Sequence, residues 1–281
     1  MLLGAHVSAA GGMHMAVRQG LELRCEVIQV FTRNQRQWNP KALEADDVAA
    51  FRREGRAAGY LKHAVSHASY LINLCATDPR THRRSLDAFA DEIERCARLG
   101  IPYLCVHPGS HLGAGEDPGL QAVAESVRGA LRKTRGKSVT VLLENTAGQG
   151  TNLGHRLEHL ATLLRLIRSR RVGVCLDTCH LFAAGYDLRT RYEETMAEVD
   201  ATVGLDRVKA FHLNDSQHPC GSRRDRHSHI GEGEIGRPAF RRLVNDGRFA
   251  DLPGLLETPG GPDGYRENLR NLRRLRKIRT R

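Results

Sequence analysis

The sequence predicts an α/β protein, a single (β/α)8 TIM barrel with its active site at the C-terminal ends of the strands. Eight short β-branched or apolar runs alternate with helical stretches, a pattern typical of a parallel sheet. The last six runs each end in a His, Asp or Glu, and in a closed barrel such strand ends ring one mouth. The eight runs cover residues 2–7, 27–32, 63–67, 103–107, 139–144, 172–177, 208–212 and 255–257.

Helical periodicity lies between these runs. Apolar residues recur at helical spacing, and Gly59 and Gly100 supply helix-ending signals. No GxGxxG turn follows the first run, so a dinucleotide-binding fold has little support. The clearest helical stretches are residues 42–58, 85–99, 120–132 and 157–169.

The chain of 281 residues is expected to be one domain, 1–281. It has no Pro/Ser-rich linker and no break in composition, and barrels of this kind typically span about 250 residues. The strongly basic segment 266–281 is predicted to be an outer helix of the same barrel, with a solvated basic face. Its apolar stripe consists of Leu269, Leu272, Leu275 and Ile278.

Composition narrows the classes of binding partner and the cellular compartment that the chain is expected to have. The net charge of +11 fits a polyanionic partner, because neutralising phosphates releases counterions. No apolar run approaches the roughly 20 residues that cross a bilayer, and the N-terminus lacks the features of a signal peptide.

Seven cysteines without a paired CxxC set fit reduced, mostly buried thiols in the cytoplasm. Cys175 and Cys179 flank Asp177, but their His and carboxylate neighbours argue against thiolate ligands.

Nine acidic and imidazole side chains have the chemistry of metal ligands. Four carboxylates pooled in a desolvated pocket repel one another, and divalent cations relieve that repulsion. His and carboxylate ligands suit zinc, iron or manganese better than calcium or magnesium. The nine candidates are His67, His107, Glu144, Asp177, His180, His212, Asp225, His227 and Glu257. Histidines expected to be surface or structural residues are His14, His63, His82, His155, His159 and His218.

The size of this set predicts more than one ion. A single zinc takes about four ligands, so nine ligands with one bridging would serve about three ions. Four carboxylates and three divalent ions leave a charge of about +2, which attracts a phosphodiester and hydroxide. Clustered metals activate water and clamp both oxygens of an in-line phosphoryl displacement. Gly-rich segments at 107–111, 144–150 and 231–236 follow or adjoin the candidate ligands and would allow close backbone approach. The residues therefore favour phosphate-ester hydrolysis.

Ordered motifs along nearly the whole chain carry a family resemblance. They are GAHVSAAGG at 4–12, FTRNQRQW at 31–38, HASYLINL at 67–74, VHPGSH at 106–111, ENTAGQG at 144–150, LDTCH at 176–180, FHLND at 211–215, DRHSHIGEG at 225–233 and LET at 256–258. Together they resemble endonuclease IV, the zinc-dependent apurinic/apyrimidinic endonuclease of base-excision repair, a TIM barrel with a trinuclear zinc centre.

The resemblance implies a ligand set and a reaction. The three implied groups are His67, His107 and bridging Glu144 for the first zinc, Glu144 with Asp177, His212 and Glu257 for the second, and His180, Asp225 and His227 for the third. Manganese or iron could replace zinc at some sites. The implied reaction hydrolyses the phosphodiester 5′ to an abasic site and leaves a 3′-hydroxyl and a 5′-deoxyribose phosphate. Glu144 or Glu257 would orient or deprotonate the attacking hydroxide, and the third zinc would stabilise the leaving 3′ oxygen.

The resemblance also implies a DNA partner, double-stranded DNA with abasic sites. Arg36, Tyr70 and Leu71, on the loops after the second and third runs, match side chains that the family inserts into the duplex to flip out the abasic nucleotide. Apolar wedges unstack and kink DNA, and flipping is cheapest where a base is missing. Arg226, between two implied ligands, is expected to contact a phosphate. The expected state is a monomer in the cytoplasm, associated with the nucleoid through DNA.

Two features depart from the family, and neither includes a ligand. The segment 258–264 is unusually rich in Gly and Pro, and the C-terminal helix is unusually basic. A sugar isomerase or epimerase of the same barrel superfamily is the main alternative, using Glu144, Asp177, His212 and Glu257. His180, the Asp225–His227 pair and the loops have no role in such a site. An inactive DNA-binding or zinc-storing barrel is a second alternative, but all nine ligand positions are filled.

Overall fold

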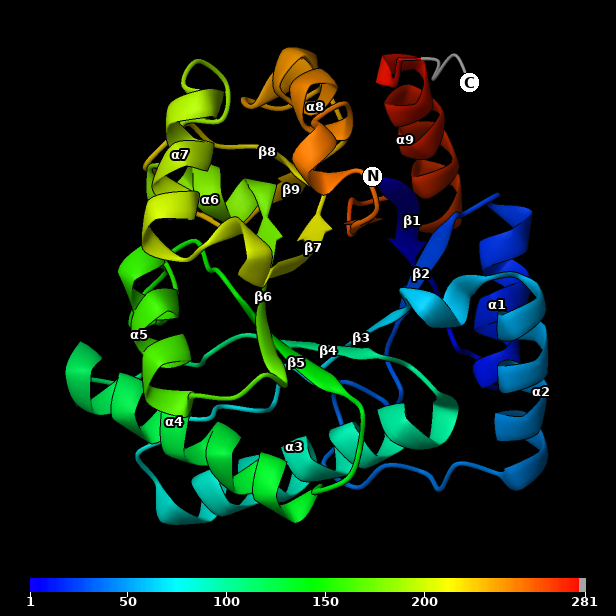
Figure 1. Ribbon diagram of the computed structural model, residues 1–281, viewed down its shortest axis with the longest axis vertical. Helices are drawn as coiled ribbons and strands as arrows, with labels where there is room; N and C mark the ends of the chain where they lie inside the picture. The colour runs from blue at the N-terminus through cyan, green and yellow to red at the C-terminus, as the bar shows by residue number, and fades with distance from the viewer. Residues whose placement is uncertain (278–281) are drawn as a thin grey trace.

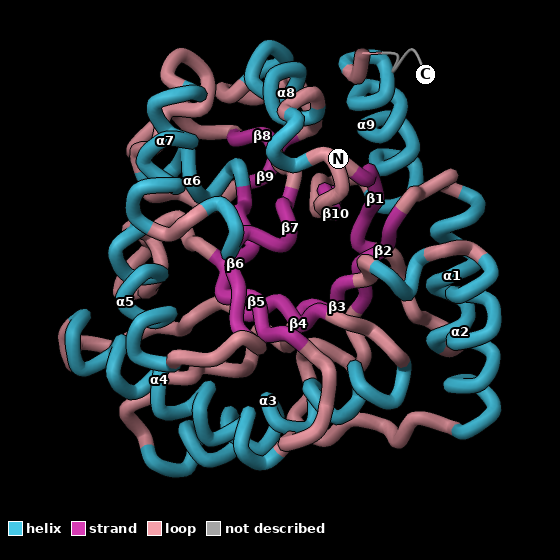
Figure 2. The backbone as a smooth tube through the Cα atoms, in the orientation of Figure 1, coloured by secondary structure: helices cyan, strands magenta, loops and turns pink. Residues whose placement is uncertain are grey.

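The chain forms a closed barrel of parallel strands ringed by helices, which confirms the predicted fold class (Figures 1 and 2). The computed structural model describes residues 1–277. Around the barrel the order is β1-β10-β7-β6-β5-β4-β3-β2. Every neighbouring pair in this ring is parallel. The barrel strands are β1 (Leu2–His6), β2 (Val27–Val30), β3 (Val65–His67), β4 (Tyr103–Val106), β5 (Thr140–Glu144), β6 (Val172–Asp177), β7 (Val208–His212) and β10 (Pro253–Leu256).

Each of the eight predicted runs contains or overlaps one of these strands. The bounds of β6 and β7 are as predicted, and the other strands differ by one to a few residues. The largest error is in the last run, 255–257, where the strand begins at Pro253 and ends before Glu257. His107 likewise follows β4 instead of ending it. Proline is tolerated as the first residue of a strand, which explains the earlier start of β10.

The four predicted helical stretches all lie within or largely overlap helices, and further helices occur that the sequence did not single out. The α-helices are α1 (Met13–Glu22), α2 (Ala45–Ala57), α3 (Pro79–Leu99), α4 (Glu116–Lys133), α5 (Leu157–Ile167), α6 (Thr178–Ala184), α7 (Tyr192–Thr202), α8 (Gly236–Val244) and α9 (Gly261–Leu275). Short 3-10 helices cover Tyr60–Lys62, Leu205–Arg207 and Gly247–Phe249. A small antiparallel pair, β8 (Asp215–Ser216) and β9 (His227–Ser228), lies between β7 and α8.

Capping residues explain why α3 begins six residues before its predicted start. Asp78 is the N-cap, and its side chain accepts a hydrogen bond from the backbone N–H of Thr81 (2.8 Å). Pro79 takes the first helical position, where its missing N–H leaves no donor unsatisfied. Gly100 ends the helix in the left-handed conformation, as its position in the sequence indicated.

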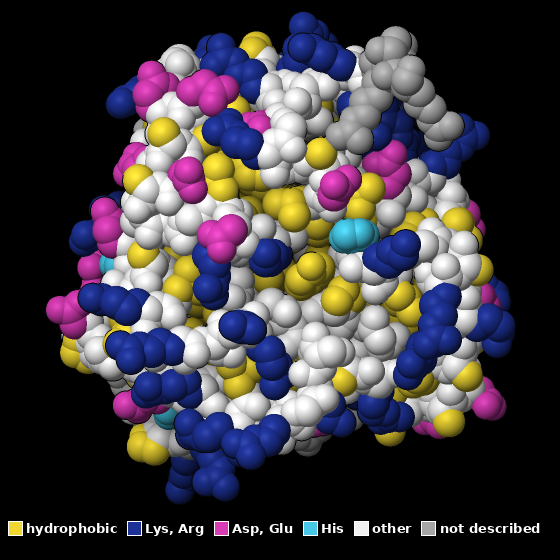
Figure 3. Space-filling view, in the orientation of Figure 1, with side chains coloured by type: hydrophobic (Ala, Val, Ile, Leu, Met, Phe, Trp, Pro, Cys, Tyr) yellow, Lys and Arg dark blue, Asp and Glu magenta, His cyan; other side chains and the backbone are white. Residues whose placement is uncertain are grey.

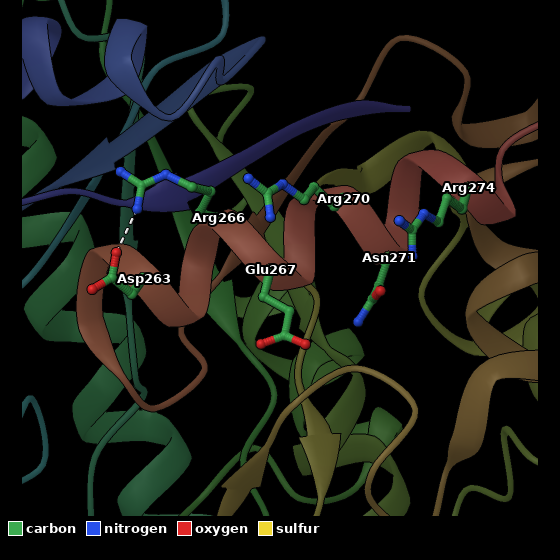
Figure 4. A pocket seen from close by; sticks show the side chains of 6 residues that line it. All are labelled: Asp263, Arg266, Glu267, Arg270, Asn271 and Arg274. Atoms are coloured by element: carbon green, nitrogen blue, oxygen red, sulfur yellow. Dashed lines mark hydrogen bonds and ion pairs between the residues drawn. The ribbon is translucent and has the colours of Figure 1, made fainter.

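The basic C-terminal helix differs in extent from the prediction of 266–281. It begins at Gly261 and ends at Leu275, and residue 278 of the predicted apolar stripe lies outside the described residues. The Gly/Pro-rich segment 258–264 leads into this helix: Gly260 is its left-handed N-cap, and Pro262 lies in the first turn. Leu269 and Leu272 are buried, whereas Arg270 and Arg274 project from the exposed face (Figure 4).

Two cores hold the barrel together. An inner cluster fills the barrel below its mouth, and a much larger outer cluster packs the helices onto the strands. The inner cluster consists of Val27, Val65, Cys105, Leu142, Cys175, Ala210 and Leu255. On the face seen in Figure 3, Lys and Arg side chains are spread around the rim among acidic ones. Within residues 1–277, no helix combines the length and the apolar character that a membrane crossing requires.

Gly4→Ala should destabilise the barrel strongly. A Cβ at position 4 would lie 1.8 Å from the carbonyl oxygen of Val27 on β2. Because that atom is backbone within the barrel, the strands must separate, and we expect a loss of about 2 kcal/mol or more in unfolding free energy. Urea denaturation measures the loss. Gly247→Ala is the control, since its Cβ would meet nothing within 4 Å and should change stability by less than about 1 kcal/mol. Equal losses in the two variants would contradict this explanation.

Candidate metal centre

All nine predicted ligands lie at the mouth formed by the C-terminal ends of the strands. Four of them end barrel strands: His67, Glu144, Asp177 and His212. His107 and Glu257 directly follow a strand, and His180 lies on α6. Asp225 and His227 come from the segment that contains β8 and β9. The closed parallel barrel is what brings these distant residues to one place.

Glu144 is the centre of the cluster. It is fully buried, and its two carboxylate oxygens face different histidines. Oε2 lies 3.0 Å from Nε2 of His67 and 3.3 Å from Nε2 of His107. Oε1 lies 2.9 Å from Nδ1 of His212. A carboxylate in this position can contact two neighbouring cations, one with each oxygen.

A second group gathers around His212. Its Nδ1 lies 3.5 Å from Oε2 of Glu257 and 3.8 Å from Oδ2 of Asp177, in addition to its contact with Glu144. Three carboxylates thus converge on a single ring nitrogen. This convergence of negative charge on one point is the arrangement expected of a cation site.

A third group is built around Asp225. Its Oδ2 lies 3.2 Å from Nε2 of His180, and its Oδ1 lies 3.2 Å from Nε2 of His227. Asp177 links this group to the second, because its Oδ2 is 3.8 Å from the same nitrogen of His227. Asp177 also caps α6 by accepting a hydrogen bond from the backbone N–H of His180 (2.9 Å). Helix α6 is therefore fixed to the strand that carries a ligand.

Hydrogen bonds behind the rings determine which nitrogen of each histidine faces the cluster. A backbone carbonyl only accepts, so a ring nitrogen bonded to one carries a hydrogen, and in the neutral ring the other nitrogen then has the free lone pair. Three histidines are held in this way by Nδ1: His67 by Ala68 O (2.8 Å), His180 by Asn145 O (2.9 Å) and His227 by Glu257 O (3.1 Å). Histidine ligands of metals are commonly oriented in this manner.

His212 is oriented by a side chain that sequence reasoning missed. Its Nε2 donates to Oε1 of Gln29 (2.8 Å), which leaves Nδ1 for the cluster. The amide nitrogen of Gln29 donates to Oε1 of Glu257 (2.6 Å). One buried amide therefore positions two of the nine residues. The sequence did carry a signal for this role, because Gln29 is the one polar residue among the apolar residues of β2.

Other supporting residues were also missed. Asn214 donates to Oδ2 of Asp177 (2.6 Å) and accepts from the backbone N–H of Glu257 (2.9 Å). His6 lies with Nδ1 3.2 Å from Oε1 of Glu257. Cys105 donates through its thiol to Oε2 of Glu144 (3.2 Å), so a buried cysteine lies directly below the cluster. Their proximity to strand ends was visible, but nothing in the sequence separated them from packing residues.

The donor set fits a divalent cation. Two ligand atoms that share one ion lie at most about 4 Å apart, because each is about 2 Å from the metal. The ligand atoms of His67, His107 and Glu144, and those of His180, Asp225 and His227, all lie within 4.8 Å of one another in their groups, so shifts of less than about 1 Å would reach that spacing. Nε2 of His227 is buried and makes no hydrogen bond of good geometry within residues 1–277, although Oδ1 of Asp225 lies 3.2 Å away. A buried nitrogen lone pair of this kind is satisfied by a metal.

Opposite charges within the cluster shift the pKa values of Glu144 and His227. Burial opposes ionisation of Glu144, but His212 and His107 outweigh it and keep the pKa of this carboxyl well below its usual range. Burial likewise opposes the charge on His227. The close contact with Asp225 and the charge of Asp177 overcome that effect and raise the pKa of His227 to about 9.

The four residues expected to contact DNA lie on segments that follow the C-terminal ends of β2, β3 and β7. Arg36 is exposed on the loop after β2, and Arg226 is exposed between two candidate ligands. Tyr70 is 63% exposed on the loop after β3, and Leu71 beside it is half-buried. The Tyr70 ring packs edge-on against Phe31, with centroids 5.6 Å apart. A groove of about 1040 Å³ runs beside these aromatic rings, and Glu257 and His227 form part of its wall.

The six histidines expected to be surface or structural lie outside the nine-residue cluster. Two of them, His155 and His159, approach Glu116 on α4. Nδ1 of His159 accepts from the backbone N–H of Gly154 (3.2 Å), so its Nε2 carries a hydrogen and donates to Glu116 (3.1 Å). This hydrogen-bond pattern leaves no free lone pair on the ring and indicates a structural role.

Comparison with known proteins defines the class of this chain. Residues 17–275 match the family model of the xylose isomerase-like TIM barrel. The structure of a D-tagatose 3-epimerase-like protein superposes with a TM-score of 0.75 at 15% identity, covering 98% of this chain and 97% of that one. At this level of identity the match shows a shared fold and nothing more.

Relatives of higher identity define the branch within that class. The chain is 51% identical to a probable endonuclease 4 of Chloroflexus aggregans, over 98% of this chain and 96% of the relative. It is 47% identical to the corresponding protein of Geobacter sulfurreducens, over 99% and 95%. The crystal structure of endonuclease IV from Thermus thermophilus superposes with a TM-score of 0.89 at 39% identity, covering 98% of each chain. The chain belongs to the endonuclease IV family.

Metal binding to the metal-free protein should release protons at neutral pH. His227, with a pKa of about 9, holds a proton below that pH and must lose it to become a ligand. The apparent affinity for Zn²⁺ should therefore rise between about pH 6 and pH 9. Titration calorimetry in buffers of different ionisation enthalpy counts the protons released. A constant affinity with no dependence on the buffer would contradict the assignment of this ring as a ligand.

Gln29→Leu should weaken metal binding by about 10- to 100-fold, because loss of an outer hydrogen-bond partner disorders the ligands that it orients. The substitution frees both His212 and Glu257 while keeping a side chain of similar length. Competition with a chromophoric chelator measures the Zn²⁺ affinity. Gln121→Leu, on the exposed face of α4, makes the same chemical change and should have no effect. Equal affinities for the Gln29 variant and the wild type would refute this role.

Proposed function

We propose that this protein is a DNA-repair endonuclease that hydrolyses the phosphodiester 5′ to abasic sites in duplex DNA. The products would be a 3′-hydroxyl and a 5′-deoxyribose phosphate. The observation that carries the proposal is the convergence of all nine His, Asp and Glu side chains at one barrel mouth. Membership of the endonuclease IV family supports the same activity, since relatives about 50% identical over the full length are named as probable endonuclease 4.

The proposed cofactor is three Zn²⁺ ions per chain, with Mn²⁺ or Fe²⁺ as substitutes at some positions. The three ligand groups are His67 and His107 with Glu144, then Glu144 with Asp177, His212 and Glu257, and finally His180, Asp225 and His227. Divalent ions bound there would lower the pKa of water and neutralise the charge on a transferring phosphoryl group. The protein supplies orientation, because hydrogen bonds fix the rings of four of the five ligand histidines, His107 being the fifth.

Glu257 is the side chain we propose to orient or deprotonate the attacking hydroxide, with Glu144 as the second candidate. Oε1 of Glu257 is held by Gln29 (2.6 Å) and lies close to His6, and the side chain is 14% exposed. It therefore reaches the groove where a phosphodiester would lie. Glu144 is completely buried, so its role is limited to bridging and electrostatics unless substrate binding opens the cluster.

The loops at the mouth supply the proposed DNA contacts. Arg36 and the Tyr70–Leu71 pair are exposed or half-exposed around the groove, where they can enter a duplex and unstack a nucleotide. Arg226 lies on the β8–β9 side of the same mouth and would contact a phosphate. The net charge of +11 favours association with the DNA backbone. We place this activity on chromosomal DNA in the cytoplasm, carried out by a monomer.

The test is incision of a labelled duplex carrying one abasic-site analogue. Zn²⁺-loaded wild type should cut 5′ to the lesion, and Glu257→Gln should cut about 10² to 10⁴ times more slowly, the usual contribution of a positioned acid–base group. Glu267→Gln is the matched control, because it makes the same change on the exposed face of α9 (Figure 4) and should keep full activity.

Two outcomes would count against the proposal. Cleavage by the Glu257 variant at the wild-type rate would remove Glu257 from the mechanism. No incision by fully metallated wild type would overturn the assignment as a repair nuclease. Epimerisation of ketohexoses would then be the next reaction to assay, since Glu144, Asp177, His212 and Glu257 are the residues such an enzyme would use.

A further inference from the structure

Two loops border the mouth of the barrel beside the metal centre. The arginine loop, residues 31–44, follows β2 and carries Arg36. The tyrosine loop, residues 68–77, follows β3 and carries Tyr70 and Leu71. Under the function proposed above, side chains of both loops enter the same duplex. The separation of the two loops then has to match the fixed spacing of the DNA.

A single buried carboxylate joins these loops. Glu92 lies on α3, is 0% exposed, and presents one oxygen to each loop. Its Oε2 accepts a hydrogen bond from the hydroxyl of Thr32 in the arginine loop (3.0 Å). Its Oε1 accepts from the backbone N–H of Ser69 in the tyrosine loop (3.0 Å). Neither loop can move away from the other without breaking a buried hydrogen bond to this side chain.

A second bond joins the loops directly. The hydroxyl of Ser69 donates to the backbone carbonyl of Gln35 across the gap (2.8 Å). The same hydroxyl accepts from the backbone N–H of Leu71 (3.3 Å). Gln35 immediately precedes Arg36, and Tyr70 lies between Ser69 and Leu71. The link therefore attaches to the backbone next to the side chains proposed to probe the duplex.

Two buried arginines hold the arginine loop from within. The guanidinium of Arg33 donates to the backbone carbonyls of Gln37 (3.0 Å) and Trp38, and its Nε lies 4.0 Å from Oε1 of Glu92. Arg95 donates to the carbonyl of Thr32 (2.9 Å). The side chain of Arg33 is only 1% exposed, so this cation cannot reach a phosphate. The Arg33 guanidinium therefore stabilises the conformation of the loop and does not contact DNA.

We propose that Glu92, with Ser69 and Arg33, is a positioning device that fixes the spacing of the two DNA-probing loops. Burying a carboxylate and two guanidinium groups is expensive, and an apolar replacement would often be neutral or stabilising. The expense is explained if the pairing specifies one loop arrangement. This inference rests on the proposed function, because the loops have to act together only if both meet a duplex. Glu92 acts through the loops and touches neither the substrate nor the metal ligands.

The proposal predicts a dependence on the form of the substrate. In duplex DNA the abasic nucleotide has to be extruded from a stack, which requires both loops in register. In a single strand there is no opposing strand to open, and the metal centre can act without the loops. Loosening the loops should therefore slow incision of a duplex much more than incision of a single strand. A substitution that merely unfolds the protein or empties the metal centre would slow both equally.

The experiment compares kcat/KM for the same abasic-site analogue in duplex and single-stranded oligonucleotides, using Zn²⁺-loaded full-length protein. Glu92→Ala should lower the duplex value about 10- to 100-fold, as small misplacements of remote groups can, and change the single-strand value by less than about threefold. Ser69→Ala should shift the ratio in the same direction while keeping the Glu92 carboxylate, which provides a milder variant if Glu92→Ala does not fold. Metal content is measured on each sample.

Two further variants sharpen the result. Glu92→Gln should recover most of the duplex preference, because its amide oxygen can accept from Ser69 N–H and its amide nitrogen can donate to the Thr32 hydroxyl. Thr134→Val removes another buried hydroxyl-to-carbonyl bond, from Thr134 to Ala130 (2.9 Å) at the far end of α4, and should leave the ratio unchanged. An unchanged ratio in both Glu92→Ala and Ser69→Ala would overturn the positioning role. Failure of the wild type on both substrates would instead overturn the proposed nuclease function.

Discussion

Mutual repulsion among four clustered carboxylates is the constraint around which this molecule is organised. Glu144 and Asp177 are completely buried, and Asp225 and Glu257 lie within a few ångströms of them through shared histidines. Burial opposes these negative charges, and the imidazoles beside Glu144 offset that effect, holding the pKa of this carboxyl well below its usual range. Divalent ions bound there would provide the same neutralisation and leave the imidazoles neutral, which supports the proposal of a metal centre.

The barrel determines where the side chains of the cluster lie. Parallel strands deliver His67, Glu144, Asp177 and His212 to one mouth by ending there. Hydrogen bonds then orient four of the histidine rings. Backbone carbonyls hold three of them, and Gln29 holds the fourth. A similar arrangement occurs at the rim, where Glu92 bonds to two loops as Gln29 bonds to two candidate ligands. In both places a buried polar side chain connects segments that act together under the proposed function.

Much of this architecture was predictable from the sequence, for a physical reason. Strands buried on both faces form short apolar runs, so the charged or imidazole residues that end the last six runs are conspicuous. Gln29, Asn214 and Cys105 were missed because a neutral polar or thiol side chain near a strand end does not differ from a packing residue until its partners are known. The start of α9 was missed because Gly260 and Pro262 indicate a loop when they are considered singly. Only the left-handed conformation of Gly260 and the helical place of Pro262 show that they begin a helix.

The proposed nuclease and the alternative sugar epimerase differ in how many of the candidate metal-binding groups at the barrel mouth they would need. A barrel with the fold of a sugar epimerase needs only the group around His212, whereas the proposed nuclease requires all three ligand groups. Anomalous diffraction from crystals of the Zn²⁺-loaded protein, measured on both sides of the zinc edge, distinguishes the two directly. We predict three zinc positions, one in each group, with Glu144 contacting two of them. A single ion beside Glu144, Asp177, His212 and Glu257, with His180, Asp225 and His227 free of metal, would contradict the central claim.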